Sequence, residues 1–250
     1  TVISFDLPVA SDVEFEIIPV LKINKQNEAQ NITDLSYFHV NYVKGKIAKN
    51  KKLADEIMLA KAFLHFSDCY GAESYINGFS GYAVELLVLS YGSFIKFIEA
   101  IAKLDSSKQK TILDPAKLYK NKEEIMREMN ESKLNSSIVL VDPTHRERNA
   151  LAALSLDTFL RFQGVCKKFL SFPSESFFIL KDKEANFDKK HEKDVIKLEL
   201  YTKKQAGDIA GTKLRKFSGF ILREIEKYFD VKASEFVYDE DKNIIRLRPG

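Results

Sequence analysis

The stretch FSGYAVELLVLSYGSF, residues 79–94, is the part of the sequence that decides the fold. Gly78, Gly81 and Gly92 interrupt a run of leucine, valine, tyrosine and phenylalanine that carries almost no charge. Glycine tolerates positive φ angles and lets another chain approach closely. The pattern predicts a buried helix that extends to about residue 104 and whose glycine-rich first turn is a contact surface.

Length and composition indicate a folded globular protein with one large or two ordinary domains. The 250 residues are 45% hydrophobic, and 39 lysines and arginines against 36 acidic residues give a net charge of +3. Because this charge is low, any surface that binds nucleic acid must be local. Cys69 and Cys166 fit neither a disulfide nor a metal-ligand pattern, which suits a reducing, cytoplasmic location. The longest apolar run is too short to span a bilayer, so we expect no membrane partner.

The beginning of the chain is predicted to consist of short strands and a linker. Residues 2–7 and 13–18 alternate between apolar and polar side chains, and the polar residues 22–34 follow them. Glu14 and Glu16 share one face of the second strand. Paired carboxylates on such a face are usually solvated, and they bind metal only in a minority of sites.

The middle of the chain is predicted to be helical. Residues 51–66 form an amphipathic helix, and a lysine-rich segment at 105–137 carries an exposed helix at 118–130. The apolar face of the first helix consists of Leu53, Ile57, Ala60, Phe63 and Leu64.

The rest of the chain is predicted to alternate strands and helices. A buried strand at 138–141 ends at Asp142, and Ser155 caps a helix that extends to about residue 170. Further strands are expected at 177–180, 195–201, 235–238 and 244–248. They surround an amphipathic helix at 211–229 that is predicted to bury Leu214, Phe217, Ile221, Ile225 and Tyr228. This order is typical of a small α+β domain.

Several blocks of the sequence resemble the archaeal (class I) CCA-adding enzymes, which are tRNA nucleotidyltransferases. The FSGY stretch and VDPTHRERNALAALSL at 141–156 are similar to motifs of this family. So are VEFEIIP at 13–19 and the triplet Tyr37-Phe38-His39. Nearly the whole chain is covered, although the last hundred residues share little identity with the family.

The resemblance implies an α+β fold in three parts. Residues 1–25 would be remnant strands of a nucleotidyltransferase palm. Residues 26–137 would be a helical neck with the lysine-rich insertion, and residues 138–250 an α+β body domain.

The resemblance also implies an activity, the template-independent addition of CMP, CMP and AMP to the tRNA 3′ end from CTP and ATP. In this family three carboxylates hold two Mg²⁺ ions, and a Gly-Ser loop grips the triphosphate. Only the third carboxylate is matched, by Glu16, which is therefore the implied catalytic and metal-binding residue. Because the family has Asp there, Asp12 or Glu14 could contribute instead. The Gly-Ser loop and the other carboxylates would come from a missing segment or a second polypeptide.

The same resemblance assigns binding residues. His39 matches a nucleotide-binding residue, Lys61 a phosphate contact, Tyr70 a triphosphate and sugar contact, and Arg148 the residue that reads the base edge. These groups suit phosphate oxygens and base acceptors. Binding of the tRNA acceptor stem is expected through Ser80, Gly81, Tyr82, Lys44 and Lys46.

Two other functions are compatible with the sequence. The chain could be a non-catalytic tRNA-binding module or subunit, or another polymerase of the nucleotidyltransferase superfamily. The block at 141–156 favours the CCA-adding group. The sequence leaves open whether the missing palm is truncated or a separate chain, and whether the protein is a homodimer.

Overall fold

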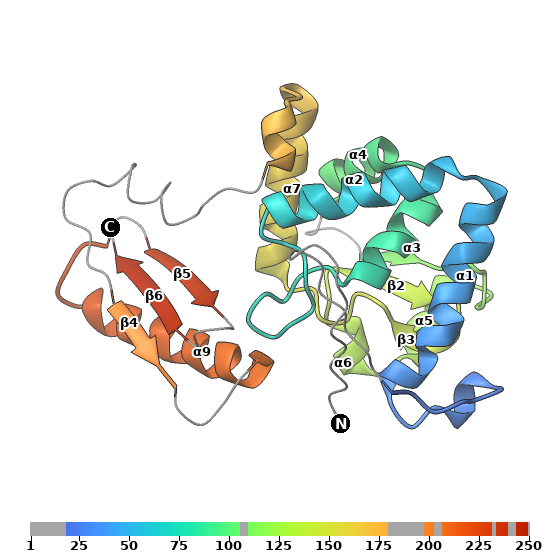
Figure 1. Cartoon of the computed structure of the whole chain (residues 1–250), viewed down its shortest axis with the longest axis horizontal. Coiled ribbons are helices and arrows are strands. Elements are labelled where there is room, and N and C mark those ends of the chain that lie inside the picture. The colour runs from blue at the N-terminus through green and yellow to red at the C-terminus, as the bar shows by residue number, and fades with distance from the viewer. Residues whose placement is uncertain are drawn as a thin grey trace, which may run out of the picture.

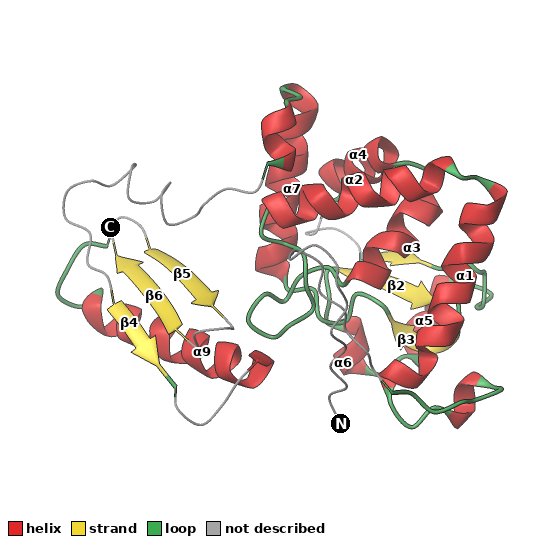
Figure 2. Ribbon diagram, in the orientation of Figure 1, coloured by secondary structure: helices red, strands yellow, loops and turns green. Residues whose placement is uncertain are grey.

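The computed structural model describes residues 19–105, 110–179, 198–202, 207–231, 234–239 and 244–249. Within these ranges the chain is an α+β protein, which confirms the predicted class (Figures 1 and 2). The predicted strands at 2–7 and 13–18, and Glu16 with them, lie outside the described residues.

Four helices build the central part of the molecule. They are α1 (Ser36–Lys49), α2 (Lys52–Phe66), α3 (Gly81–Tyr91) and α4 (Phe94–Lys103). Two 3₁₀ turns, η1 (Gln26–Glu28) and η2 (Ile32–Leu35), interrupt the predicted linker. The predicted apolar face of α2 is confirmed, since all five of its residues are buried.

The single helix expected from residue 79 to about residue 104 is wrong, because the structure divides it into α3 and α4. Gly92 ends α3 with a φ of 85°, and its N–H donates to the Val88 carbonyl at 2.7 Å. This left-handed conformation favours glycine. Ser93 then starts α4, where its hydroxyl accepts from the Lys96 N–H at 3.2 Å.

A further helix, α7 (Leu156–Ser171), completes the main core. Ser155 caps it as predicted, and its hydroxyl accepts from the Thr158 N–H at 3.2 Å. The ring of Phe63 lies at the centre of the core, 5.3 Å from Phe94 and 5.9 Å from Phe162, measured between ring centroids. Edge-to-face pairs of this kind stabilise a core beyond the area they bury.

The predicted strand at 177–180 is wrong within the described residues. The chain forms instead a 3₁₀ turn, η3 (Glu175–Phe178). It is held by the aromatic core, because Phe177 stacks on Phe63 with a centroid distance of 6.1 Å and Phe178 lies 5.7 Å from the same ring.

The first sheet has the order β1-β2-β3, formed by β1 (Thr111–Leu113), β2 (Ile138–Asp142) and β3 (His145–Asn149). Strand β1 is parallel to β2, and β3 is antiparallel to it. Strand β2 is buried along its whole length, as predicted. Its side chains alternate between two clusters: Ile138 and Leu140 join the main core, and Val139 and Val141 face the other side.

The lysine-rich segment covers this other side. It contains α5 (Lys122–Glu128) and α6 (Glu131–Leu134). The exposed helix expected at 118–130 is therefore shorter, and it is not fully exposed, because Ile125 and the flanking Met129 are buried against Val139 and Val141. Strand β1 of this segment pairs with β2, which lies on the other side of the predicted boundary at residue 137. The division of the chain at residues 25 and 137 stays a prediction.

In the part of the chain that the structure describes, the C-terminal unit consists of a second sheet and one helix. The sheet has the order β4-β6-β5, with β4 (Leu198–Tyr201), β5 (Ser234–Asp239) and β6 (Ile244–Pro249), all antiparallel. Helix α9 (Gly207–Ile225) lies across one face of it (Figure 1). The predicted hairpin at the C-terminal end is confirmed.

The predicted buried face of α9 is mostly wrong. Only Leu214 of the five expected residues is buried, while Phe217 and Tyr228 are 50% and 81% exposed. The buried positions are instead Ala210, Gly211, Leu214 and Ser218. Small residues are required there, because a Cβ atom at Gly211 would lie 2.6 Å from the Tyr75 ring and 2.9 Å from the Tyr238 ring.

The loop between α2 and α3, residues 67–80, contacts the C-terminal unit. The Ser74 N–H donates to Asp208 at 2.8 Å, and Arg215 donates to the Tyr75 carbonyl. The rings of Tyr75 and Tyr238 meet edge to face with 5.1 Å between centroids.

Both cysteines are buried free thiols in the core around Phe63. Burial raises the pKa of the Cys69 and Cys166 thiols above the usual value. Within the described ranges, no helix is both long enough and apolar enough to cross a membrane.

Candidate functional site

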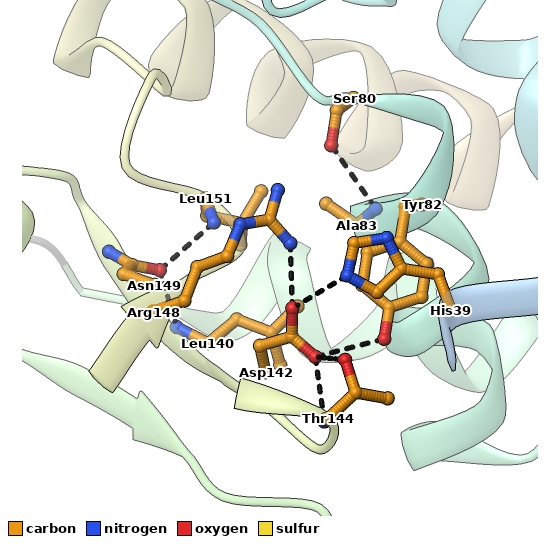
Figure 3. A network of polar contacts seen from close by, with 10 residues as sticks. All are labelled: His39, Ser80, Tyr82, Ala83, Leu140, Asp142, Thr144, Arg148, Asn149 and Leu151. Carbon is orange, nitrogen blue, oxygen red and sulfur yellow. Dashed lines mark hydrogen bonds and ion pairs between the residues drawn. The ribbon is translucent and has the colours of Figure 1, made fainter. Parts of the chain in front are cut away.

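A buried carboxylate, Asp142, stands at the centre of the candidate site (Figure 3). It is the last residue of β2, and an irregularity of register between Val141 and Asp142 turns the chain towards β3. The first oxygen, Oδ1, accepts from the Thr144 N–H and the Thr144 hydroxyl, both at 2.8 Å, and from the Tyr82 hydroxyl at 3.0 Å.

The second oxygen of Asp142 faces two cationic or ionisable side chains (Figure 3). Arg148 donates from Nη1 to Oδ2 at 2.7 Å, and His39 Nε2 lies 3.2 Å from the same oxygen. Burial by itself raises the pKa of this carboxyl. The nearby His39 and the hydrogen bonds from Thr144 and Arg148 outweigh it and hold the pKa well below the usual range. Asp142 is therefore an ionised, fully buried group.

Tyr82, in the first turn of α3, lies between the two partners of Oδ2. Its ring stacks on His39 with 4.0 Å between centroids, and the Arg148 guanidinium carbon lies 5.8 Å from the ring centre. Burial, and then the charge of Asp142, raise the pKa of Tyr82. The hydroxyl therefore stays a donor. Three predicted site residues, His39, Tyr82 and Arg148, thus meet around one carboxylate.

A second cluster forms beside the first turn of α3. Lys61 of α2 pairs with Glu85 of α3 at 2.6 Å. A Cβ atom at Gly81 would lie 2.7 Å from the Tyr70 hydroxyl and 3.9 Å from Lys61 Nζ. Since Gly81 has no such atom, the tip of Tyr70 approaches the helix closely. The predicted residues Lys61, Tyr70 and Gly81 are thus brought together.

The other predicted residues are placed less centrally. Ser80 caps α3, and its hydroxyl accepts from the Ala83 N–H at 3.2 Å. Lys44 and Lys46 are exposed on α1, where the Lys46 ammonium lies 5.4 Å from the centre of the Tyr42 ring. Glu16 lies outside the described residues, so the implied metal position has no described geometry.

A cavity of about 540 Å³ opens beside Arg148. Its polar wall includes Gln30, Asn31, Ser80, His145, Arg148 and Asn149. Asn149 is itself fixed, because its Oδ1 accepts from the Leu140 and Leu151 N–H groups, each at 2.9 Å. The volume suits a small ligand, and the amide and guanidinium groups suit a polar one.

Asp142, Thr144 and Glu85 belong to the two clusters but were not predicted as site residues. Two of them, Asp142 and Glu85, had a signal in the sequence. Asp142 is an acidic residue attached directly to an apolar strand, and Glu85 is the only charged residue in the apolar stretch at 79–94. A charge in such surroundings needs a partner, which points to an ion pair.

The described residues do not fit a metal site. They contain no group of three or more His, Cys, Asp and Glu side chains placed to hold an ion. Asp142 also directs both of its oxygens at hydrogen-bond donors rather than at open space.

Comparison with known proteins shows which protein family this sequence matches. Residues 55–179, half of the chain, match the sequence model described as tRNA nucleotidyltransferase, second domain. The CCA-adding enzyme of Nanoarchaeum equitans is 30% identical over 231 residues, which cover 92% of this chain and 55% of that protein. The CCA-adding enzyme of Pyrococcus abyssi is 35% identical over 179 residues, covering 70% and 38%.

The CCA-adding enzyme of Saccharolobus solfataricus is 30% identical over 228 residues, covering 89% of this chain and 50% of the relative. The chain thus spans about half the length of the curated relatives it matches. The family match includes most of α2 and all of α3, β2 and β3, the elements that carry most of both clusters. The chain therefore belongs to the tRNA nucleotidyltransferase family, as its resemblance to the archaeal CCA-adding enzymes predicted.

Proposed function

We propose that this chain forms the neck and body of a CCA-adding tRNA nucleotidyltransferase, which adds CMP, CMP and AMP to the tRNA 3′ end. The observation that carries the proposal is Arg148, whose guanidinium is held by the buried Asp142 and also lines the 540 Å³ cavity. A fixed guanidinium presents several donors in one plane, which suits the acceptor atoms of a base edge.

The second cluster supports a triphosphate site. Lys61 and Tyr70 converge beside Gly81, where a cation and a hydroxyl would meet phosphate oxygens. Lys61 already pairs with Glu85 at 2.6 Å, so a bound phosphate would share or replace that partner. His39, stacked on Tyr82, would contact the same nucleotide.

The divalent ion of the reaction would be Mg²⁺, with Glu16 as its ligand from this chain. The remaining carboxylates and the Gly-Ser loop would come from a segment or polypeptide beyond residues 1–250. The described residues would not ligate the ion. Their part is to bind and orient the nucleotide and the RNA.

The RNA partner would be the tRNA acceptor stem, recognised by its shape and backbone. Ser80, Gly81 and Tyr82 would meet it at the start of α3, and Lys44 and Lys46 on the exposed side of α1. Lysines there would neutralise phosphates, so binding should weaken steeply with salt. A homodimer and a cytoplasmic location stay predictions.

The test is nucleotide addition to tRNA that ends before CCA. We expect no addition by residues 1–250 alone. Addition of C and A should appear when a polypeptide with the Gly-Ser loop and two carboxylates is supplied. If the chain binds tRNA but the mixture adds nothing, the non-catalytic binding module is the better description. Addition of U or G at the rate of C or A would contradict the assigned base specificity.

A further inference from the structure

The two oxygens of Asp142 serve different parts of the molecule. Oδ1 accepts from both donors of Thr144, which fix the turn between β2 and β3, and from the Tyr82 hydroxyl. Oδ2 accepts from Arg148 at 2.7 Å and lies 3.2 Å from His39. One oxygen thus supports the turn and the start of α3, and the other faces the two proposed nucleotide contacts.

Asp142 itself is absent from the cavity wall, whereas Arg148 lies in that wall. The Asp142 side chain has no exposed area, and that of Arg148 is 22% exposed. One terminal nitrogen of Arg148 points to Asp142 and the other points away from it (Figure 3). The carboxylate therefore restricts rotation of the guanidinium from the side away from the cavity. The remaining N–H donors of Arg148 stay available to a ligand.

We propose that Asp142 is a positioning residue for nucleotide selection, which acts through Oδ2 by fixing the plane of the Arg148 guanidinium against the cavity. This inference rests on the proposed function. An arginine without this partner would rotate, and its donors would match C and A no better than U and G. A guanidinium held in one orientation presents its N–H donors at fixed positions, so it discriminates between bases whose acceptor atoms lie at different positions.

Asp142→Asn tests the two oxygens separately. Asparagine has one acceptor oxygen and one donor NH₂ group. The oxygen is expected to stay with the three donors at Oδ1, which places the NH₂ group against Arg148. Two donors then oppose each other, and Arg148 loses its partner. His39 is less affected, because a neutral imidazole nitrogen can accept a hydrogen bond.

Thr144→Val is the matched control. It removes one hydrogen bond to Oδ1 and leaves both partners of Oδ2 in place. Thr144 is nearly buried, so this variant should lower the melting temperature as a structural change would. Its preference for C and A should not change.

The readout is kcat/KM for CTP and UTP in the complete enzyme, with Arg148→Ala and the double variant alongside. Asp142→Asn should lower the preference for CTP over UTP by roughly 10- to 100-fold, because a charged hydrogen bond is lost. The double variant should be no less selective than Arg148→Ala alone, because Asp142 acts only through Arg148 and both changes remove the same interaction. Equal losses for CTP and UTP, or effects that add fully, would overturn the proposal.

A second measurement needs neither activity nor a variant that folds. In the unaltered protein, a guanidinium held from one side should give separate, slowly averaging Nη signals for Arg148 in ¹⁵N NMR spectra. A single averaged signal would overturn the proposal even if the enzyme is selective. Conversely, separate signals in a chain that adds no nucleotide even with the polypeptide carrying the Gly-Ser loop and two carboxylates would refute the proposed function while leaving the contact established.

Discussion

The core around Phe63 and the C-terminal unit around α9 bury their side chains to different degrees. The first has a continuous cluster from α2, α3, α4 and α7, with Phe63, Phe97 and Phe162 wholly buried. In the described part of the second, the buried cluster is Ala210 and Leu214, and Phe217 and Phe220 of α9 are each 50% exposed. Both clusters of site residues adjoin the first core. Side chains that must hold a ligand in a fixed geometry need rigid neighbours.

The largest effect expected from this difference is on stability. Phe63→Ala should lower the free energy of unfolding by about 3–5 kcal/mol, because it opens a cavity among several aromatic rings. Phe217→Ala on α9 should change it by less than about 0.5 kcal/mol, because the ring is half exposed. Urea unfolding of both variants measures the contrast. Similar losses would show that the two regions are equally well packed.

A smaller effect is expected on nucleotide discrimination. Arg148→Ala should cost about 1.5–3 kcal/mol in the selection of CTP and ATP over UTP and GTP, since one charged hydrogen-bonding group is removed. Arg215→Ala is the control from α9, where the guanidinium donates to the Tyr75 carbonyl and lies 6.0 Å from the Phe236 ring. It should loosen the C-terminal unit without altering base preference. Unchanged selection in Arg148→Ala would make Arg148 structural.

The charge of Asp142 also predicts a pH dependence. Its pKa in the folded protein is lowered, so its stabilisation is present above the unfolded value, about 3.9, and is lost as the pH falls through the folded value. The difference in melting temperature between the wild type and Asp142→Asn should therefore shrink from about pH 6 to about pH 3. A constant difference over this interval would mean that the carboxylate charge adds no stability.

The smallest effects are expected from two helical glycines. Gly81→Val should push the Tyr70 hydroxyl aside and weaken tRNA binding with little loss of stability, since the tip of a tyrosine can move. Gly219→Ala on α9 meets only Arg223 at 3.6 Å, so it should stabilise the protein by about 0.5–1 kcal/mol. Salt titrations of tRNA binding and thermal melts separate the two outcomes. Wild-type binding by Gly81→Val would remove the start of α3 from the RNA path.

The sequence predicted the elements whose burial follows from their own periodicity. Helix α2 and strand β2 are examples, because their apolar residues recur at the spacing of a helix and of a fully buried strand. The face of α9 was mispredicted because its buried positions are small. Gly211 is buried through Tyr75 and Tyr238, which are distant in sequence, and not through its own hydrophobicity.

The site was predictable only in part for a similar reason. His39, Lys61, Tyr70 and Arg148 were named from a resemblance to a family, and the structure gathers them at two neighbouring places. Asp142 was missed although its acidic side chain ends an apolar strand, because the strand pattern does not say which groups surround that side chain. Its neighbours come from α1, α3 and the turn and strand after β2, and only the folded chain brings them together.

The two buried thiols allow opening of the core around Phe63 to be measured separately from opening of the α9 unit, without any substitution. Cys69 and Cys166 are the only cysteines of the chain, and both lie in the core around Phe63. A thiolate is the nucleophile that attacks an alkylating reagent, and burial disfavours both the thiolate and the reagent's access. The rate of labelling therefore reports the opening of that core alone, and fraying of the α9 unit would leave the chain unlabelled. A series of mass spectra recorded over time would then distinguish local opening of the α9 unit from global unfolding.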